Sequence, residues 1–511
     1  MTLMIEKPFP HGSSLLTVYI ILILCMCATN HRNNIWNREG TLWQDTIKKS
    51  PLKARPYNSL GIHYMEEKKY LQAIKRFKHA LELNPTYYLA YNNLGTAYEV
   101  QGYYQKAAWA YKKTLHYSPS FAQAIYNLGK LYHNQKLYEQ AREEYEKALR
   151  INSRLPQAHN NLGSIYNHQQ QHDKALSEFT QALAIDPLFE TAYNNLGITH
   201  FNKGNYQKAI HYYRKALQLN PKFAEAYNNL GIVCNHRGDY TQAISAFKKA
   251  LASQPDFAEA YNNLAIAYNN QEAYDHAIPT LFMALKLDPS HAEAYYNLGN
   301  AYAGKDSNEK AVSSYREAIA LDPKLTEAYN NLAIIYNKKG EPDQAVPLLK
   351  KAITLKPHFV DAYNNLGIAY YHISEYKKAI QYHQKALQIN PSLKEAYYSM
   401  ANAYNKLGLY DTAIVSFKKS LELDPDCADT HNNLGAVYKA KGWWEKAIEE
   451  FKHATMDNPD HALAHLNLAI VYAAQSKDKE KALYHFNRCI SINPNLPQLK
   501  MVKKRFLTLI N

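Results

Sequence analysis

A 34-residue period constrains this chain more than any other feature, and it runs almost unbroken from Ala54 to Leu496. Each period places an aromatic residue, a leucine, a small residue and a tyrosine before an alanine, a second aromatic residue and a proline: Tyr91, Leu94, Gly95, Tyr98, Ala107, Tyr111 and Pro119. The small residue recurs in register as Gly129, Gly163, Gly197, Gly231, Ala265, Gly299, Ala333, Gly367, Ala401, Gly435 and Ala469. Thirteen such units leave little length for a catalytic domain.

The residue types in one unit predict two antiparallel helices. Apolar residues fall at helical spacing in two blocks. Gly95 and Ala107 are small where the helices must cross closely, and close packing must offset the roughly 0.5–1 kcal/mol that a helical glycine costs. Pro119 ends the second helix, because proline has no N–H to donate and disfavours helix in the residue before it. A helix pair cannot bury its apolar face alone, so neighbouring units must stack.

This spacing resembles the tetratricopeptide repeat, with tyrosine usually where that family often has tryptophan. The resemblance implies an all-α fold, a right-handed α-solenoid of about thirteen helix-turn-helix units. The pattern departs from the family at a few positions: Ser153 for proline, Leu281, Leu349 and His383 for the second aromatic residue, and one extra residue near 476–480.

The repeats divide the chain into four parts. Residues 1–30 hold a hydrophobic segment at about 12–30, and residues 31–53 form a junction. Residues 54–496 hold the thirteen repeats. Residues 497–511 are basic and amphipathic, and we expect them to form a helix that caps the last unit.

The segment LLTVYIILILCMCA at 15–28 predicts an uncleaved, single-pass membrane helix. Its apolar run is shorter than the ~20 residues that a spanning helix prefers, but polar ends extend it. A cleaved signal peptide is the alternative, although no small-residue cleavage site follows. Arg32 and Arg38 would place the repeats in the cytoplasm.

The junction HRNNIWNREGTLWQDTIKKSPLKARPYNSL at 31–60 resembles one in membrane proteins that join a glycosyltransferase-like domain to C-terminal tetratricopeptide repeats. Transmembrane-and-tetratricopeptide mannosyltransferases belong to that group. In that family the catalytic part lies in many upstream membrane helices, which this chain lacks, and the repeats face away from the cytoplasm. The side of the membrane therefore stays open.

No motif for catalysis or cofactor binding is present. The chain has no P-loop, GxGxxG, HExxH or GxSxG motif, so we expect neither an enzyme nor a cofactor or small-molecule substrate. His461 and His465 have a metal-binding spacing but no third ligand nearby, so we expect no metal site. Half of the net charge of +14 lies outside the repeats, which argues against nucleic-acid binding.

A column of asparagines is the better candidate for a binding site. In this fold the first helix of each unit lines the groove, and its sixth position is asparagine in eleven units: Asn93, Asn127, Asn161, Asn195, Asn229, Asn263, Asn297, Asn331, Asn365, Asn433 and Asn467. Ser59 and Ser399 are the exceptions. Amides donate and accept, so this column could bond an extended peptide backbone. It resembles the asparagine ladder of O-linked N-acetylglucosamine transferase. Alternatively, the amides bond the neighbouring unit or are consensus residues.

A second column, at the second position of the first helices, is acidic over seven units: Glu225, Glu259, Glu293, Glu327, Asp361, Glu395 and Asp429. Acidic residues there favour the helix dipole, which is one explanation. They would also give the groove a preference for basic ligands. We therefore predict a membrane-anchored scaffold that binds protein or peptide segments. The alternative is the substrate-recruiting half of a membrane glycosyltransferase whose catalytic part is missing.

Overall fold

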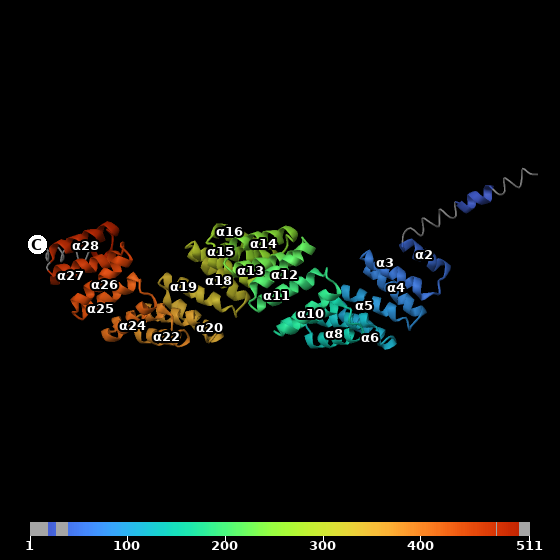
Figure 1. Ribbon diagram of the computed structural model, residues 1–511, viewed down its shortest axis with the longest axis horizontal. Helices are drawn as coiled ribbons and strands as arrows, with labels where there is room; N and C mark the ends of the chain where they lie inside the picture. The colour runs from blue at the N-terminus through green and yellow to red at the C-terminus, as the bar shows by residue number, and fades with distance from the viewer. Residues whose placement is uncertain (1–18, 27–38, 477, 500–511) are drawn as a thin grey trace, which may run out of the picture. The chain divides into compact units, whose positions relative to one another are not determined.

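The computed structural model describes residues 19–26, 39–476 and 478–499, and this part of the chain is all-α, with no strand. Helix α2 (Glu39–Lys49) packs against the first repeat, and thirteen helix pairs follow. The chain forms two compact units, residues 1–233 and 234–511, which are described separately. Figure 1 labels the helices in chain order.

The first helices of the pairs are α3 (Ala54–Glu66), α5 (Tyr88–Val100), α7 (Ala122–Asn134), α9 (Pro156–His168), α11 (Glu190–Asn202), α13 (Ala224–His236), α15 (Ala258–Asn270), α17 (Ala292–Gly304), α19 (Thr326–Lys338), α21 (Val360–His372), α23 (Lys394–Lys406), α25 (Ala428–Ala440) and α27 (Ala462–Val471). The second helices are α4 (Tyr70–Leu83), α6 (Tyr104–Tyr117), α8 (Tyr138–Ile151), α10 (His172–Ile185), α12 (Tyr206–Leu219), α14 (Tyr240–Ser253), α16 (Tyr274–Leu287), α18 (Asn308–Leu321), α20 (Pro342–Leu355), α22 (Tyr376–Ile389), α24 (Tyr410–Leu423), α26 (Trp444–Asp457) and α28 (Lys479–Ile492).

Both turns of each repeat follow from local chemistry. The residue between the two helices of a pair has a left-handed backbone, as at Gly102 (φ 74°) and Ser374 (φ 63°). A glycine adopts this conformation without steric cost. In most repeats the second helix ends just before an Asp or Asn whose side chain closes a short turn. Asp186 Oδ1, for example, accepts a hydrogen bond from the Leu188 backbone N–H at 3.0 Å.

The small and aromatic columns meet in the core of each helix pair. A Cβ added to Gly95 would lie 2.6 Å from the Tyr111 ring, and one on Gly163 would lie 2.7 Å from Phe179. These glycines therefore leave room for the ring of the second helix. Where Leu281 replaces the ring, the small residue is alanine, Ala265, and both are fully buried. Leu349 and Ala333 show the same combination: a side chain smaller than the usual ring on the second helix lies opposite one larger than glycine on the first.

The last pair contains the one-residue insertion that the sequence places near 476–480. There α27 continues into a π-helix, η1 (Tyr472–Ser476). A π-turn absorbs one extra residue without ending the helix. The insertion is thus accommodated at the end of the first helix, and α28 keeps its packing against α27.

The two ends of the chain lie mostly outside the described residues. Residues 19–26 form a helix with exposed side chains, and the rest of the segment predicted to anchor the chain, residues 12–30, is not described. Within the described part, no helix is long and apolar enough to cross a membrane. Of the predicted cap at 497–511, only residues 497–499 are described, and they are helical.

Candidate functional site on the first helices

The first helices form one layer of each compact unit. Within each unit, several first helices also contact the first helix of the next repeat, as α3 with α5 and α19 with α21. The layer in which successive helices lie closest is the inner side of a curved stack. Positions 2, 6, 9 and 13 of a helix share one face, as Glu259, Asn263, Ile266 and Asn270 do on α15. This set of positions on the first helices is called the inner face below.

The asparagines at position 6 bond the preceding repeat. The side-chain Nδ2 donates to Oδ1 of the asparagine 35 residues earlier, at position 5 of the preceding first helix. The donor–acceptor distances are 3.1 Å for Asn93 to Asn58, 3.1 Å for Asn127 to Asn92, 2.9 Å for Asn195 to Asn160, 3.0 Å for Asn229 to Asn194, 2.9 Å for Asn297 to Asn262, 3.0 Å for Asn365 to Asn330 and 2.9 Å for Asn467 to Asn432.

This series of hydrogen bonds between repeats, called the ladder below, continues where position 5 is tyrosine. Asn161, Asn331 and Asn433 then donate to the hydroxyls of Tyr126, Tyr296 and Tyr398 at 3.4, 3.3 and 2.9 Å. Asn263 holds the same register and, like all of the column except buried Asn297, is partly exposed. Each of these bonded amides therefore uses at least one of its two N–H groups between repeats.

The amide oxygens are what the column offers to a ligand. Within the described residues, no donor contacts the Oδ1 atoms of Asn93, Asn195, Asn297 and Asn365. Others are occupied, since Asn467 Oδ1 accepts from Lys439 Nζ at 2.6 Å. A primary amide has two N–H groups, and most of these asparagines use one of them between repeats. The column therefore presents amide oxygens together with fewer donors than isolated amides would offer.

The acidic column lies on the same face. Six of its members are exposed: Glu225, Glu259, Glu293, Asp361, Glu395 and Asp429. Glu327 is partly exposed and pairs with Lys356 Nζ at 3.1 Å, and Asp429 accepts from His461 Nε2 at 3.1 Å. The other five have no ion-pair partner within the described residues.

An apolar column, which the sequence reasoning missed, completes the inner face. Position 9 is most often isoleucine, and these side chains are partly exposed: Ile198, Ile232, Ile266, Ile334 and Ile368. Their spacing of 34 residues or a multiple of it was the available signal. The inner face thus combines carboxylates, amide oxygens and aliphatic surface.

The ladder breaks between α21 and α23, where position 6 is Ser399. There the Oδ1 of Asn364, at position 5, is bonded by His383 Nδ1 at 2.9 Å instead. His383 is fully buried, and burial lowers its pKa to about 4, so the ring is neutral and donates from Nδ1. Among the residues that the structure describes, its Nε2 has no hydrogen-bond partner. The two departures from the repeat pattern, His383 and Ser399, therefore belong to one local arrangement.

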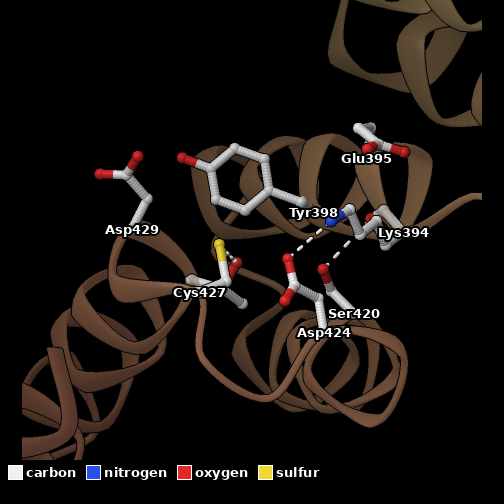
Figure 2. A pocket seen from close by; sticks show the side chains of 8 residues that line it. Lys394, Glu395, Tyr398, Ser420, Asp424, Cys427 and Asp429 are labelled. Carbon is white, nitrogen blue, oxygen red and sulfur yellow. Dashed lines mark hydrogen bonds and ion pairs between the residues drawn. The ribbon is translucent and has the colours of Figure 1, made fainter. Parts of the chain in front are cut away.

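Figure 2 shows a cavity of about 200 Å³ beside Tyr398, close to this break. Lys394 Nζ donates to Asp424 at 2.7 Å, which raises the lysine pKa and neutralises both charges locally. Glu395 and Asp429 also line the cavity. The surplus charge here is therefore negative.

Two histidine groups lie outside the inner-face columns. His461 Nδ1 accepts from the Ala464 backbone N–H at 3.1 Å and so caps α27. His465 does not pair with His461, because its Nδ1 forms a hydrogen bond with His485 Nδ1 at 2.9 Å. Glu39, His63 and Glu66 offer ligand atoms all within 4.8 Å of one another, a cluster that the sequence reasoning did not single out.

Comparisons with known proteins agree with this architecture. Residues 120–187, 154–222, 188–256 and 222–290 match a family model described as "Tetratricopeptide repeat", and 292–325, 326–359 and 360–393 match a second of that description. Residues 61–102 and 401–442 match "TPR repeat", and 437–497 match another tetratricopeptide repeat model. The comparison with curated proteins gives no match. A solved structure, "Crystal structure of APC/C hetero-tetramer Cut9-Hcn1", is similar with 17% identity over 88% of this chain and 96% of that chain, at a TM-score of 0.49.

Proposed function

Because this chain belongs to the tetratricopeptide repeat proteins, whose repeats bind protein partners, we propose that it is a scaffold without catalytic activity that binds extended, basic protein segments along its inner face. The proposal concerns the ligand class and its location. It includes attachment to a membrane through residues 12–30, which the sequence predicts.

One observation carries the proposal: the polar groups at positions 2 and 6 of the inner face are predominantly acceptors over the repeats from α13 to α25. The ladder uses at least one N–H of each bonded amide between repeats, so amide oxygens and carboxylates outnumber the amide donors that remain for a ligand. An extended peptide has backbone N–H groups at regular intervals, and lysine and arginine side chains are donors only. Such a segment is the polymer whose donors match this surface.

The carboxylates favour basic segments through their number. A single exposed ion pair contributes only about 0.2–1 kcal/mol. Glu259 and Glu293 occupy successive repeats, and both lack an ion-pair partner within the described residues. Several weak pairs along one segment raise its affinity and its association rate, and both effects should decline with salt.

Charge reversal tests the proposal. The variant is Glu259→Lys with Glu293→Lys, and the probe is a fluorescein-labelled dodecapeptide of alternating lysine and alanine. We expect its affinity, measured by fluorescence anisotropy at low salt, to fall about tenfold, which corresponds to about 1.4 kcal/mol. The slope of affinity against salt concentration should also decrease.

A matched control separates binding from helix stability. Glu445 and Glu480 hold the second position of the second helices α26 and α28, both are exposed, and neither has an ion-pair partner within the described residues. Reversing these two charges changes the net charge by the same amount as the inner-face variant does. It also removes the same favourable interaction with the helix dipole, roughly 0.3–1 kcal/mol per residue, but on the other helix layer. If the two double variants bind the peptide equally well, the inner face is not the binding site.

A further inference from the structure

We propose that the inner face holds, at Ser399, a pocket for one aromatic side chain of the bound protein segment, with a basic residue next to it in that segment. The inference rests on the proposed function and names the feature that the segment must carry. The pocket lies among α21, α23 and α25, all within the second compact unit.

The cavity lies where the ladder lacks its position-6 amide. Between the third and fourth repeats, the Tyr145 hydroxyl and the Asn161 amide, sixteen residues apart, meet at 3.2 Å. The equivalent residues in the tenth and eleventh repeats are His383 and Ser399, also sixteen apart. Ser399 lines the cavity and is shorter than an asparagine, so the volume that the amide fills elsewhere is open.

The resulting cavity suits an aromatic ring. It has a volume of about 380 Å³ and is lined by Ile368, Tyr371, His372, Tyr398, Ser399, Asn402 and Asn433. An apolar cavity of about 150 Å³ is enough to hold benzene, and ligand pockets commonly span about 300–1,000 Å³. The aliphatic and aromatic members of the lining supply the apolar contacts that such a ring needs.

The aromatic walls are held in place before a ligand arrives. The Tyr398 hydroxyl accepts from Asn433 Nδ2 at 2.9 Å, and the Tyr398 ring packs edge-on against Phe417 with centroids 6.1 Å apart. Tyr371 packs edge-on against Tyr376 at 5.4 Å. A ring that enters between Tyr371 and Tyr398 therefore meets aromatic surfaces that need little rearrangement.

The neighbouring charge identifies the residue beside the aromatic one. Tyr398 is shared with the cavity in Figure 2, where Glu395 and Asp429 lie on either side of its ring. The only lysine in that lining, Lys394, is neutralised by Asp424. A segment that places a ring in the pocket thus passes carboxylates, which favours lysine or arginine next to the ring.

A peptide array tests the inference with the full chain. The probe is a set of immobilised dodecapeptides of random sequence, and the variant is Ser399→Asn, which should restore the ladder and fill the pocket. Ser59→Asn is the matched control, since Ser59 is the other position-6 serine and lies on the first helix of the first repeat. Tyr371→Ala is a second variant, which removes one wall of the pocket instead of filling it.

We expect the parent and the control to retain peptides enriched in an aromatic residue adjacent to lysine or arginine. Ser399→Asn and Tyr371→Ala should lose the aromatic enrichment and keep the basic one. In solution, replacing the aromatic residue of a retained peptide by alanine should weaken binding to the parent about tenfold or more, and binding to Ser399→Asn less than about twofold.

The outcomes distinguish this inference from the proposed function. Retention of basic peptides without aromatic enrichment would contradict the proposed aromatic pocket but not the proposed scaffold function. The same holds if Ser399→Asn keeps the aromatic preference of the parent. If no peptide is retained by the parent, the proposed function fails, and the pocket fails with it.

Discussion

His383 and Ser399 should be energetically coupled, although they lie in different repeats. His383 Nδ1 supplies the hydrogen bond to Asn364 Oδ1 at 2.9 Å that a position-6 asparagine supplies at most other junctions. Two changes test this, His383→Phe and Ser399→Asn, made singly and together. Phenylalanine should fit, because Phe179 packs against Gly163 in the same way that His383 packs against Gly367.

The expected magnitude follows from burial. His383 is fully buried and Asn364 is 9% exposed. His383→Phe leaves the Asn364 oxygen without its donor, which costs about 1–3 kcal/mol, partly offset by removing the unpartnered Nε2. Ser399→Asn places an amide within reach of the same oxygen. The double variant should therefore be about 1–3 kcal/mol more stable than the sum of the two single changes predicts.

Native-state hydrogen exchange of α21–α23 measures this coupling. A long repeat array does not unfold in two states, so local opening free energies are the appropriate quantity. Ser399→Ala, which supplies no amide, is the control and should show no coupling with His383→Phe. Additivity within about 0.5 kcal/mol in the cycle of His383→Phe with Ser399→Asn would refute the shared hydrogen-bond arrangement.

Three further outcomes are expected from the same structure. Lowering the pH from 7 to 5 should reduce the local opening free energy around α22 by about 2 kcal/mol more in the parent than in His383→Phe. The reason is that the unfolded histidine (pKa 6.5) binds a proton that the folded one (pKa about 4) excludes. Equal pH profiles of the two proteins in hydrogen exchange would contradict the burial argument. Asn297→Ala should lower the local stability by about 1–3 kcal/mol, because the buried Asn262 Oδ1 loses its donor. Asn202 is exposed, so Asn202→Ala should change the stability by less than about 0.5 kcal/mol in the same assay. Residues 12–30 should retain the full chain in membranes after carbonate washing, whereas a chain that starts at Arg32 should be released, and release of both would argue against the anchor.

The helical repeat could be predicted from the sequence because its causes are local. Helix spacing, the turn before the proline and the small residue opposite the ring depend on residues within one unit, and this pattern recurs over thirteen units with few departures. The paired exchange of Ala265 with Leu281 shows that even core volume is balanced inside one helix pair. The acidic and asparagine columns were visible in the same way.

The use of those asparagines depends on a contact that no single unit contains. An amide at position 6 can bond a ligand or a neighbour equally well, and only packing places Asn297 Nδ2 2.9 Å from Asn262 Oδ1, 35 residues away. The spacing of 35 residues, one period plus one residue, was visible in the sequence. Only the stacking of the repeats shows that this spacing joins a donor to an acceptor.

The pocket at Ser399 depended still more on tertiary structure. It includes the volume that Ser399 leaves unfilled, and its walls come from three first helices. Periodicity revealed both departures from the pattern, yet their proximity comes from the packing of one repeat on the next. The sequence thus determined the repeating unit. Stacking decided which polar atoms remain for a partner, because hydrogen bonds between repeats use part of the donor capacity of the asparagines, and the sequence alone does not show which partner each amide takes.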